Sequence, residues 1–218
     1  MGYSIELDDL SVVFGGKVVL DGIDLALPER GVVTLMGPGG VGKSTLLRTI
    51  CGLLFDVAYA QIDGEMTFCG EPISADHHPA IVKQKLHLAN ATVLEHFAAQ
   101  LANRENYTRE QQRNIFGEYL DEVGLGYLAD KFGEPVTALE SVDHRLVTMA
   151  AESFGDPAVL CVDEPTAALE DDDAARILRF LSNQGLERMV LFVTHNQRHA
   201  RQSADYAALL AGGHIVEY

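Results

Sequence analysis

The most constraining feature of the sequence is a glycine-rich segment at residues 37–44, GPGGVGKS, which fits the pattern GxxxxGK[ST]. It follows a short apolar run at 32–36, which is typical of a strand buried on both faces. A predicted helix begins at about Lys43 and runs to about Cys51. This strand–loop–helix order is the context in which the pattern holds phosphate.

Each residue type in the segment has a chemical reason to be there. Glycines let backbone N–H groups curl around an anion without interference from side chains, and the positive end of the following helix points at the same place. Lys43 would bring a cation to the β- and γ-phosphates, and the Ser44 hydroxyl can ligate Mg²⁺. The alternative is a glycine-rich turn with an exposed lysine, and the strand and helix on either side disfavour it.

Two further predicted strands end in polar side chains. The apolar run 158–162 leads into Asp163 and Glu164, and the run 189–193 leads into Thr194 and His195. At the carboxyl ends of parallel strands these groups would face the crevice of the phosphate loop. Asp163 could hold Mg²⁺ through its water shell and Glu164 could polarise a water molecule. A histidine at a strand end is more often structural, but this strand should end near the γ-phosphate.

The remaining pattern predicts an α/β fold with a P-loop NTPase core. Residues 3–14 and 18–27 read as a hairpin joined by Gly15 and Gly16, which gives an antiparallel N-terminal portion. A helix predicted at about 171–183 lies between the strands at 158–162 and 189–193, and this order implies a mostly parallel sheet. Two further strands, at 206–210 and 214–216, complete the sheet. Helical periodicity at 92–103 and 108–123 predicts a helical subdomain. We expect one domain, 1–218, with a nucleotide-binding core at 1–84 and 156–218 and a helical insertion at about 85–155.

Composition excludes several classes of protein. The chain has 16 Lys and Arg against 32 Asp and Glu, a formal net charge of -16, so we expect no direct nucleic-acid partner. No stretch approaches the ~18 apolar residues of a membrane span, and the N-terminal residues do not resemble a signal peptide. Three cysteines without CxxC spacing fit a reduced, cytosolic compartment.

In this order, the motifs resemble those of the ATP-binding cassette family, the nucleotide-binding subunits of ABC transporters. Residues 37–45 resemble its Walker A motif, 159–170 (VLCVDEPTAALE) its Walker B motif and D-loop, and 194–196 (THN) its H-loop. The resemblance implies catalytic roles for Lys43, Glu164 and His195, and Mg²⁺ binding by Ser44 and Asp163. The nucleotide-binding residues that it implies are Phe14, Gly37, Pro38, Gly39, Gly40, Val41, Gly42, Lys43, Ser44 and Thr45.

Two of the implied residues depend on register alone. Phe14 stands where the family keeps an aromatic side chain that stacks on adenine, although it would serve equally as a core residue of the hairpin. Gln84 resembles the Q-loop glutamine, which ligates Mg²⁺ and senses the membrane partner.

The sequence departs from the family signature, LSGGQ, at most positions. The matching register is 139–143, which reads LESVD, so that only Leu139 is retained. In the family, two cassettes sandwich two ATP molecules, and the signature of one contacts the γ-phosphate held by the other. Here Glu140 replaces the serine, and two unit charges ~4 Å apart repel by about 4 kcal/mol at an effective dielectric constant of about 20. Val142 also brings a branched side chain where backbone should approach closely.

The resemblance implies an ATP-hydrolysing subunit, peripheral on the cytoplasmic face of the membrane, that powers a separate permease and pairs with a second cassette. The altered signature predicts weak or asymmetric ATPase activity. An alternative is an ATP-gated dimerising switch or assembly module that takes no part in transport. An unrelated P-loop kinase or GTPase is disfavoured by DEPTAAL at 163–169 and by the absence of NKxD.

Overall fold

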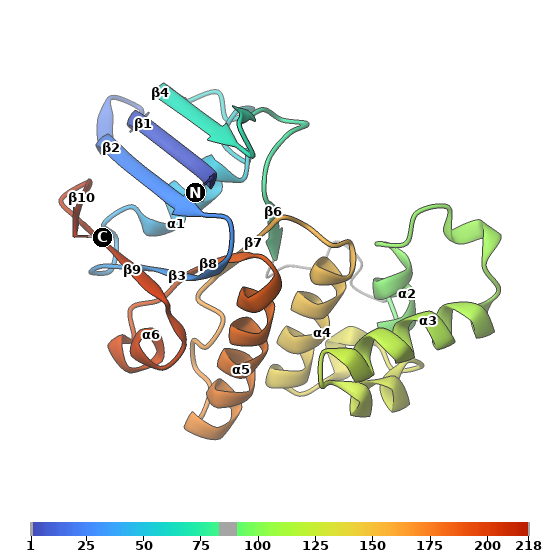
Figure 1. Cartoon of the computed structure of the whole chain (residues 1–218). Coiled ribbons are helices and arrows are strands. Elements are labelled where there is room, and N and C mark those ends of the chain that lie inside the picture. Colours follow the sequence, from blue (N-terminus) through green and yellow to red (C-terminus); the bar gives the residue numbers. More distant parts are fainter. Residues whose placement is uncertain (1, 83–90, 218) are drawn as a thin grey trace.

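The structure is a computed structural model that describes residues 2–82 and 91–217 of the chain. It contains two sheets (Figure 1). The smaller sheet is antiparallel, with the strand order β2-β1-β4-β5. Its strands are β1 (Tyr3–Phe14), β2 (Lys17–Pro28), β4 (Ala60–Phe68) and β5 (Glu71–Pro72). The predicted hairpin is confirmed: Gly15 and Gly16 have φ of 55° and 85°, and a tight turn of this kind needs positive φ at both positions.

The larger sheet is mostly parallel and has the order β10-β9-β3-β8-β7-β6. Only the pair β9 and β10 is antiparallel among its described pairs. Its strands are β3 (Gly31–Met36), β6 (Ala80–Val82), β7 (Val159–Asp163), β8 (Met189–Val193), β9 (Tyr206–Ala211) and β10 (His214–Glu217). The strands β3, β7 and β8 therefore end at the same edge of the sheet, as the sequence predicted.

Helices cover both faces of this sheet. Helix α1 (Lys43–Ile50) lies between the two sheets, while α4 (Ser141–Phe154), α5 (Asp171–Glu187) and α6 (Gln197–Ser203) lie on the other side (Figure 1). Every residue of β8 is buried, and its side chains alternate between two cores. Leu191 packs in the core beneath α1 and the antiparallel sheet, whereas Phe192 packs in the core that α4 and α5 share.

The helical region extends from one end of the parallel sheet (Figure 1). It contains α2 (Val93–Ala98), η1 (Arg104–Asn106), α3 (Arg109–Glu122), η2 (Gly126–Lys131) and η3 (Val136–Ala138), followed by α4. Thr92 and Thr108 cap α2 and α3, and each forms a capping box with the residue three positions on. The prediction of a helix over 92–103 was too long. Asn103 adopts a left-handed φ of 52°, which Asn tolerates better than most residues.

Other differences from the sequence prediction arise from tertiary pairing. From the sequence pattern, a strand is predicted only at about 65–69, but β4 begins at Ala60, because residues 60–63 pair with Ser11–Phe14 of β1. It ends before Cys69, which has a left-handed φ of 52°. Neither β6 nor α6 was predicted. The three residues of β6 are strand because they pair with β7.

We predict that Phe116→Ala lowers the free energy of unfolding by about 3–5 kcal/mol. Phe116 is fully buried in α3, and its ring centroid lies 5.5 Å from that of Phe97 and 5.1 Å from that of Phe154. Removing the ring leaves a cavity between three elements. Urea denaturation measures the change, and Tyr107→Ala, at an exposed position beside the same helix, is the control. A loss below about 1 kcal/mol would show that this cluster does not anchor the helical region.

Candidate nucleotide-binding site

The glycine-rich loop follows β3 and ends at Gly42, the residue that precedes α1. Gly37 has φ of 149°, and a Cβ built there would lie 2.2 Å from the carbonyl oxygen of Leu210. Gly42 has φ of 112°, and its Cβ would lie 2.9 Å from a side-chain carbon of Leu20. Only glycine fits these two positions, because a side chain would be both strained and in collision.

The start of α1 presents donors to this loop. Among the described residues, no side chain caps the helix, and its first turn holds no acidic residue. Its first N–H groups and the positive end of its dipole are therefore directed toward the loop. Lys43 is only 7% exposed, and its ammonium donates to the carbonyl oxygens of Gly37 and Pro38 at 2.9 and 2.8 Å. The loop thus concentrates positive charge and N–H donors where an anion would lie.

The acidic pair after β7 lies beside this loop. The Ser44 hydroxyl donates to a carboxylate oxygen of Asp163 at 3.2 Å, which joins the first turn of α1 to the end of β7. A hydroxyl and a carboxylate are hard oxygen donors of the kind that Mg²⁺ prefers. The two residues therefore fit a magnesium ion, which they would hold through these oxygens.

Glu164 and His195 meet at the ends of neighbouring strands. The His195 Nδ1 lies 2.9 and 3.0 Å from the two carboxylate oxygens of Glu164, a spacing at which an Nδ1–H donates to the carboxylate. The Glu164 N–H donates to the carbonyl of Val193, which prolongs the pairing of β7 with β8. Glu164 has φ of 48°, an unfavourable conformation for a residue with a side chain. Such strain is typical of positions that the surrounding structure holds for function.

Two aromatic side chains meet at the C-terminal end of β1. The Phe14 ring is half-buried against the core, and its centroid lies 5.9 Å from that of Tyr59. Tyr59 is 69% exposed and belongs to no motif, so no sequence pattern predicts its contact with Phe14. Adenine stacking by Phe14 stays a prediction. Gln84 lies outside the described residues.

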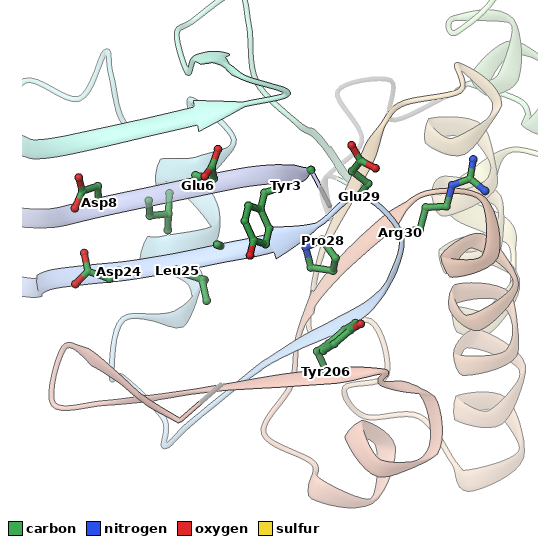
Figure 2. Close-up of a pocket in the computed structure, with 12 residues that line it drawn as sticks. Tyr3, Glu6, Asp8, Asp24, Leu25, Pro28, Glu29, Arg30 and Tyr206 are labelled. Atoms are coloured by element: carbon green, nitrogen blue, oxygen red, sulfur yellow. The ribbon is translucent and has the colours of Figure 1, made fainter.

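A cavity of about 950 Å³ lies away from these groups (Figure 2). It opens where β3 and β9 begin, at the edge of the sheet opposite the glycine-rich loop. Its lining includes Tyr3, Glu6, Asp24, Arg30 and Tyr206 (Figure 2). None of the residues predicted from the motifs lines it.

Comparison with known proteins assigns the family. The family model described as ABC transporter matches residues 20–167. The probable amino-acid import ATP-binding protein YxeO of Bacillus subtilis (strain 168) is 31% identical over 98% of this chain and 88% of its own length. The chain belongs to the ABC transporter family. It is therefore an ATP-binding protein and an ATPase of that family.

Other relatives of this ABC protein agree. The phosphate import ATP-binding protein PstB of Thermococcus kodakarensis is 30% identical over 100% of this chain and 90% of its own length. The structure of cbiO1 from Clostridium perfringens, part of the ABC transporter complex cbiONQ, has a TM-score of 0.80. It is 22% identical and covers 99% of this chain and 88% of its own, so that it supports the fold.

Residues 139–143, the segment predicted to be an altered signature, lead into the first turn of α4. Glu140 is the residue before the helix, it is exposed, and its side chain makes no capping hydrogen bond. Val142 is 1% exposed and packs in the core. Glu140 and Ser141 are thus the exposed residues of the segment, and a carboxylate replaces a neutral hydroxyl at the tip of the helix.

Unlike the exposed Glu140, Asp143 forms buried contacts with neighbouring elements. It is 3% exposed, and its carboxylate accepts hydrogen bonds from Tyr127 and Lys131 at 2.7 Å and from Arg176 at 3.0 Å. Burial alone raises the pKa of Asp143, but the hydrogen bonds from Lys131 and Tyr127 outweigh it and leave the pKa below its usual value. These contacts join α4 to η2 and α5.

We predict that Asp143→Asn lowers the free energy of unfolding by about 1–3 kcal/mol at neutral pH, because two cations lose their charged acceptor. A carboxyl whose pKa is lowered by folding stabilises the protein above its unfolded pKa, about 3.9, and loses this effect as the pH falls through the folded pKa. The difference between the wild type and the variant should therefore narrow below about pH 4. Urea titrations at several pH values measure it, with Asp130→Asn in η2 as the control. A difference independent of pH would contradict the ion pairing.

Proposed function

We propose that residues 37–45 bind the phosphates of MgATP and that Glu164 polarises the water that attacks the γ-phosphorus. One observation carries the proposal. The Ser44–Asp163 contact and the Glu164–His195 contact both lie at the edge of the sheet where β3 ends and the glycine-rich loop begins. Lys43 would stabilise charge on the β- and γ-phosphates. Ser44 and Asp163 would hold Mg²⁺, which when bound neutralises phosphate charge.

The proposed reaction is an in-line displacement. Glu164 orients the water, whose oxygen forms a bond to the γ-phosphorus while the bond from phosphorus to the ADP oxygen breaks. The Glu164 carboxylate accepts a proton from the water, and the products are ADP and inorganic phosphate. His195 holds the Glu164 carboxylate in position through the contact at its Nδ1. The N–H groups of the loop and Lys43 stabilise the negative charge that develops.

We further propose that the protein powers import through a separate membrane subunit. The relatives named above are import ATP-binding proteins, and cbiO1 is part of a transporter complex. Among the described residues, no helix combines the length and the apolar character that crossing a membrane requires. As the family resemblance implies, we propose that the chain lies on the cytoplasmic face of the membrane. The helical subdomain at about 85–155 and the loop of Gln84 would dock the permease.

We expect Glu164→Gln to preserve ATP binding and to lower turnover by at least about a hundredfold, because an amide cannot accept the proton of the attacking water. Binding of a fluorescent ATP analogue and release of phosphate measure the two properties. Glu187→Gln, at an exposed position at the end of α5, is the matched control. Turnover at the wild-type rate in Glu164→Gln would remove Glu164 from its proposed role.

The active form would contain two cassettes, with ATP between the loop of one and the signature of the other. The exposed carboxylate of Glu140 at the tip of α4 would then face a triphosphate. A homodimer would have two impaired sites, whereas a partner cassette with an intact signature would restore one. This proposal predicts weak or asymmetric ATPase activity.

We expect Glu140→Ser to raise the ATP turnover of the purified chain about tenfold or more, because it removes the repulsion and restores a hydroxyl. This single change is sharper than replacing 139–143 by LSGGQ, which would also break the ion pairs of Asp143. Glu134→Ser, a nearby exposed acid, controls for net charge. An unchanged rate in folded Glu140→Ser would contradict the proposed effect of the signature.

The same carboxylate favours a second candidate, an ATP-gated dimerising switch that takes no part in transport. In a switch, binding rather than rapid hydrolysis produces the output, so a weak signature would be tolerated. Co-purification of the tagged chain with a multi-span membrane protein would favour the transport function. Dimerisation on ATP without such a partner would favour the switch.

A further inference from the structure

The loop after Glu164 is held from two sides. On one side, Arg145 of α4 donates from Nη1 to the carbonyl oxygen of Pro165 and from Nη2 to that of Ala167, each at 2.6 Å. On the other side, the Thr166 hydroxyl lies 2.9 Å from Nδ1 of His199 in α6. The backbone of residues 165–167 is thus fixed between two helices, directly after the residue that we propose polarises the water.

Arg145 suits this position because its guanidinium is planar and rigid. Its two terminal nitrogens meet two carbonyls that are two residues apart, which fixes both the position and the orientation of the peptide segment. The segment also begins and ends in unfavourable backbone conformations, with φ of 48° at Glu164 and 57° at Ala168. A strained loop keeps its shape only where its surroundings over-determine it, and Arg145 supplies two of the contacts that do so.

We propose that Arg145 is a positioning residue for ATP hydrolysis, which keeps the Glu164 carboxylate against His195 by holding the loop that follows it. The inference rests on the proposed role of Glu164. Within residues 2–82 and 91–217, the Arg145 side chain makes no hydrogen bond to the glycine-rich loop or to Ser44, so its effect falls on the chemical step and not on nucleotide binding. It also lies in the helix whose first turn is the signature, which links that turn to the loop of this chain's own catalytic glutamate.

The first test separates hydrolysis from binding. A displacement of about 1 Å in a catalytic group can lower a rate by about a hundredfold. We expect Arg145→Met to lower kcat at least about tenfold while KM and the affinity for a fluorescent ATP analogue change less than about twofold. Arg145→Lys keeps the charge but can donate to only one of the two carbonyls at a time. Its kcat should lie between that of Arg145→Met and that of the wild type.

Arg188 offers a matched control. Like Arg145, it donates to two backbone carbonyl oxygens, those of Ser153 and Pro157, at 3.4 and 3.1 Å. These contacts do not involve the loop after Glu164. Arg188→Met should lower the unfolding temperature yet retain the wild-type kcat. If Arg145→Met and Arg188→Met lower kcat and stability to the same extent, Arg145 is a structural residue and the proposal is overturned.

A second measurement does not depend on turnover. In protein labelled with ¹⁵N-histidine, the imidazole signal of His195 is identified by its loss in His195→Gln. Because its Nδ1 contacts Glu164, this signal should shift in Arg145→Met and stay in place in Arg188→Met. An unmoved signal in Arg145→Met would overturn the proposal even if turnover were too slow to measure.

The outcome also distinguishes this inference from the proposed function. In the background of Glu164→Gln, Arg145→Met should cause no further loss of residual turnover, because it acts through the group already removed. If Glu164→Gln loses hydrolysis while Arg145→Met keeps both the wild-type kcat and the His195 signal, the positioning role fails and the proposed function stands. If Glu164→Gln hydrolyses ATP at the wild-type rate, both fail.

Discussion

The parallel pairing of β3, β8 and β7 is the constraint on which the candidate site depends. In the register of this sheet, Val193 of β8 lies opposite Leu35 on one side and Asp163 on the other. The pairing continues past the ends of the strands, since the N–H of Glu164 donates to Val193 and that of Thr194 donates to Leu35. Both faces of β8 are buried, and each face packs in a different core. A shift of the strand pairing by one residue would move every side chain of β8 into the opposite core, so the packing fixes the register.

Charge poses the second constraint, because an acidic chain must bind a polyanion. The proposed phosphate loop would meet this constraint locally, with backbone N–H groups and the Lys43 ammonium instead of a general excess of cations. The acids nearby are then of two kinds. Asp163 lies beside the Ser44 hydroxyl and is compatible with a bound metal ion, whereas the exposed carboxylate of Glu140 at the tip of α4 would repel a phosphate placed beside it.

Sequence patterns predicted those parts of the structure that local residues determine. The glycine-rich loop, the Gly15-Gly16 turn and the caps at Thr92 and Thr108 depend on residues a few positions apart, and the family comparison confirms the fold that they imply. The contacts of Asp143 and Arg145 could not be predicted in this way, because their partners lie in other elements. Strand β6 likewise exists through its pairing with β7.

Helix α4 connects these observations. Asp143 and Arg145 are two positions apart, so their side chains project from α4 about 200° from one another, given 3.6 residues per turn. One is tied to η2 and α5, and the other to the loop after Glu164. The helix therefore cannot rotate about its axis without breaking one set of contacts. Within the segment predicted to be the signature, Asp143 anchors inward while Glu140 is exposed, so α4 connects that exposed tip to the loop that follows Glu164.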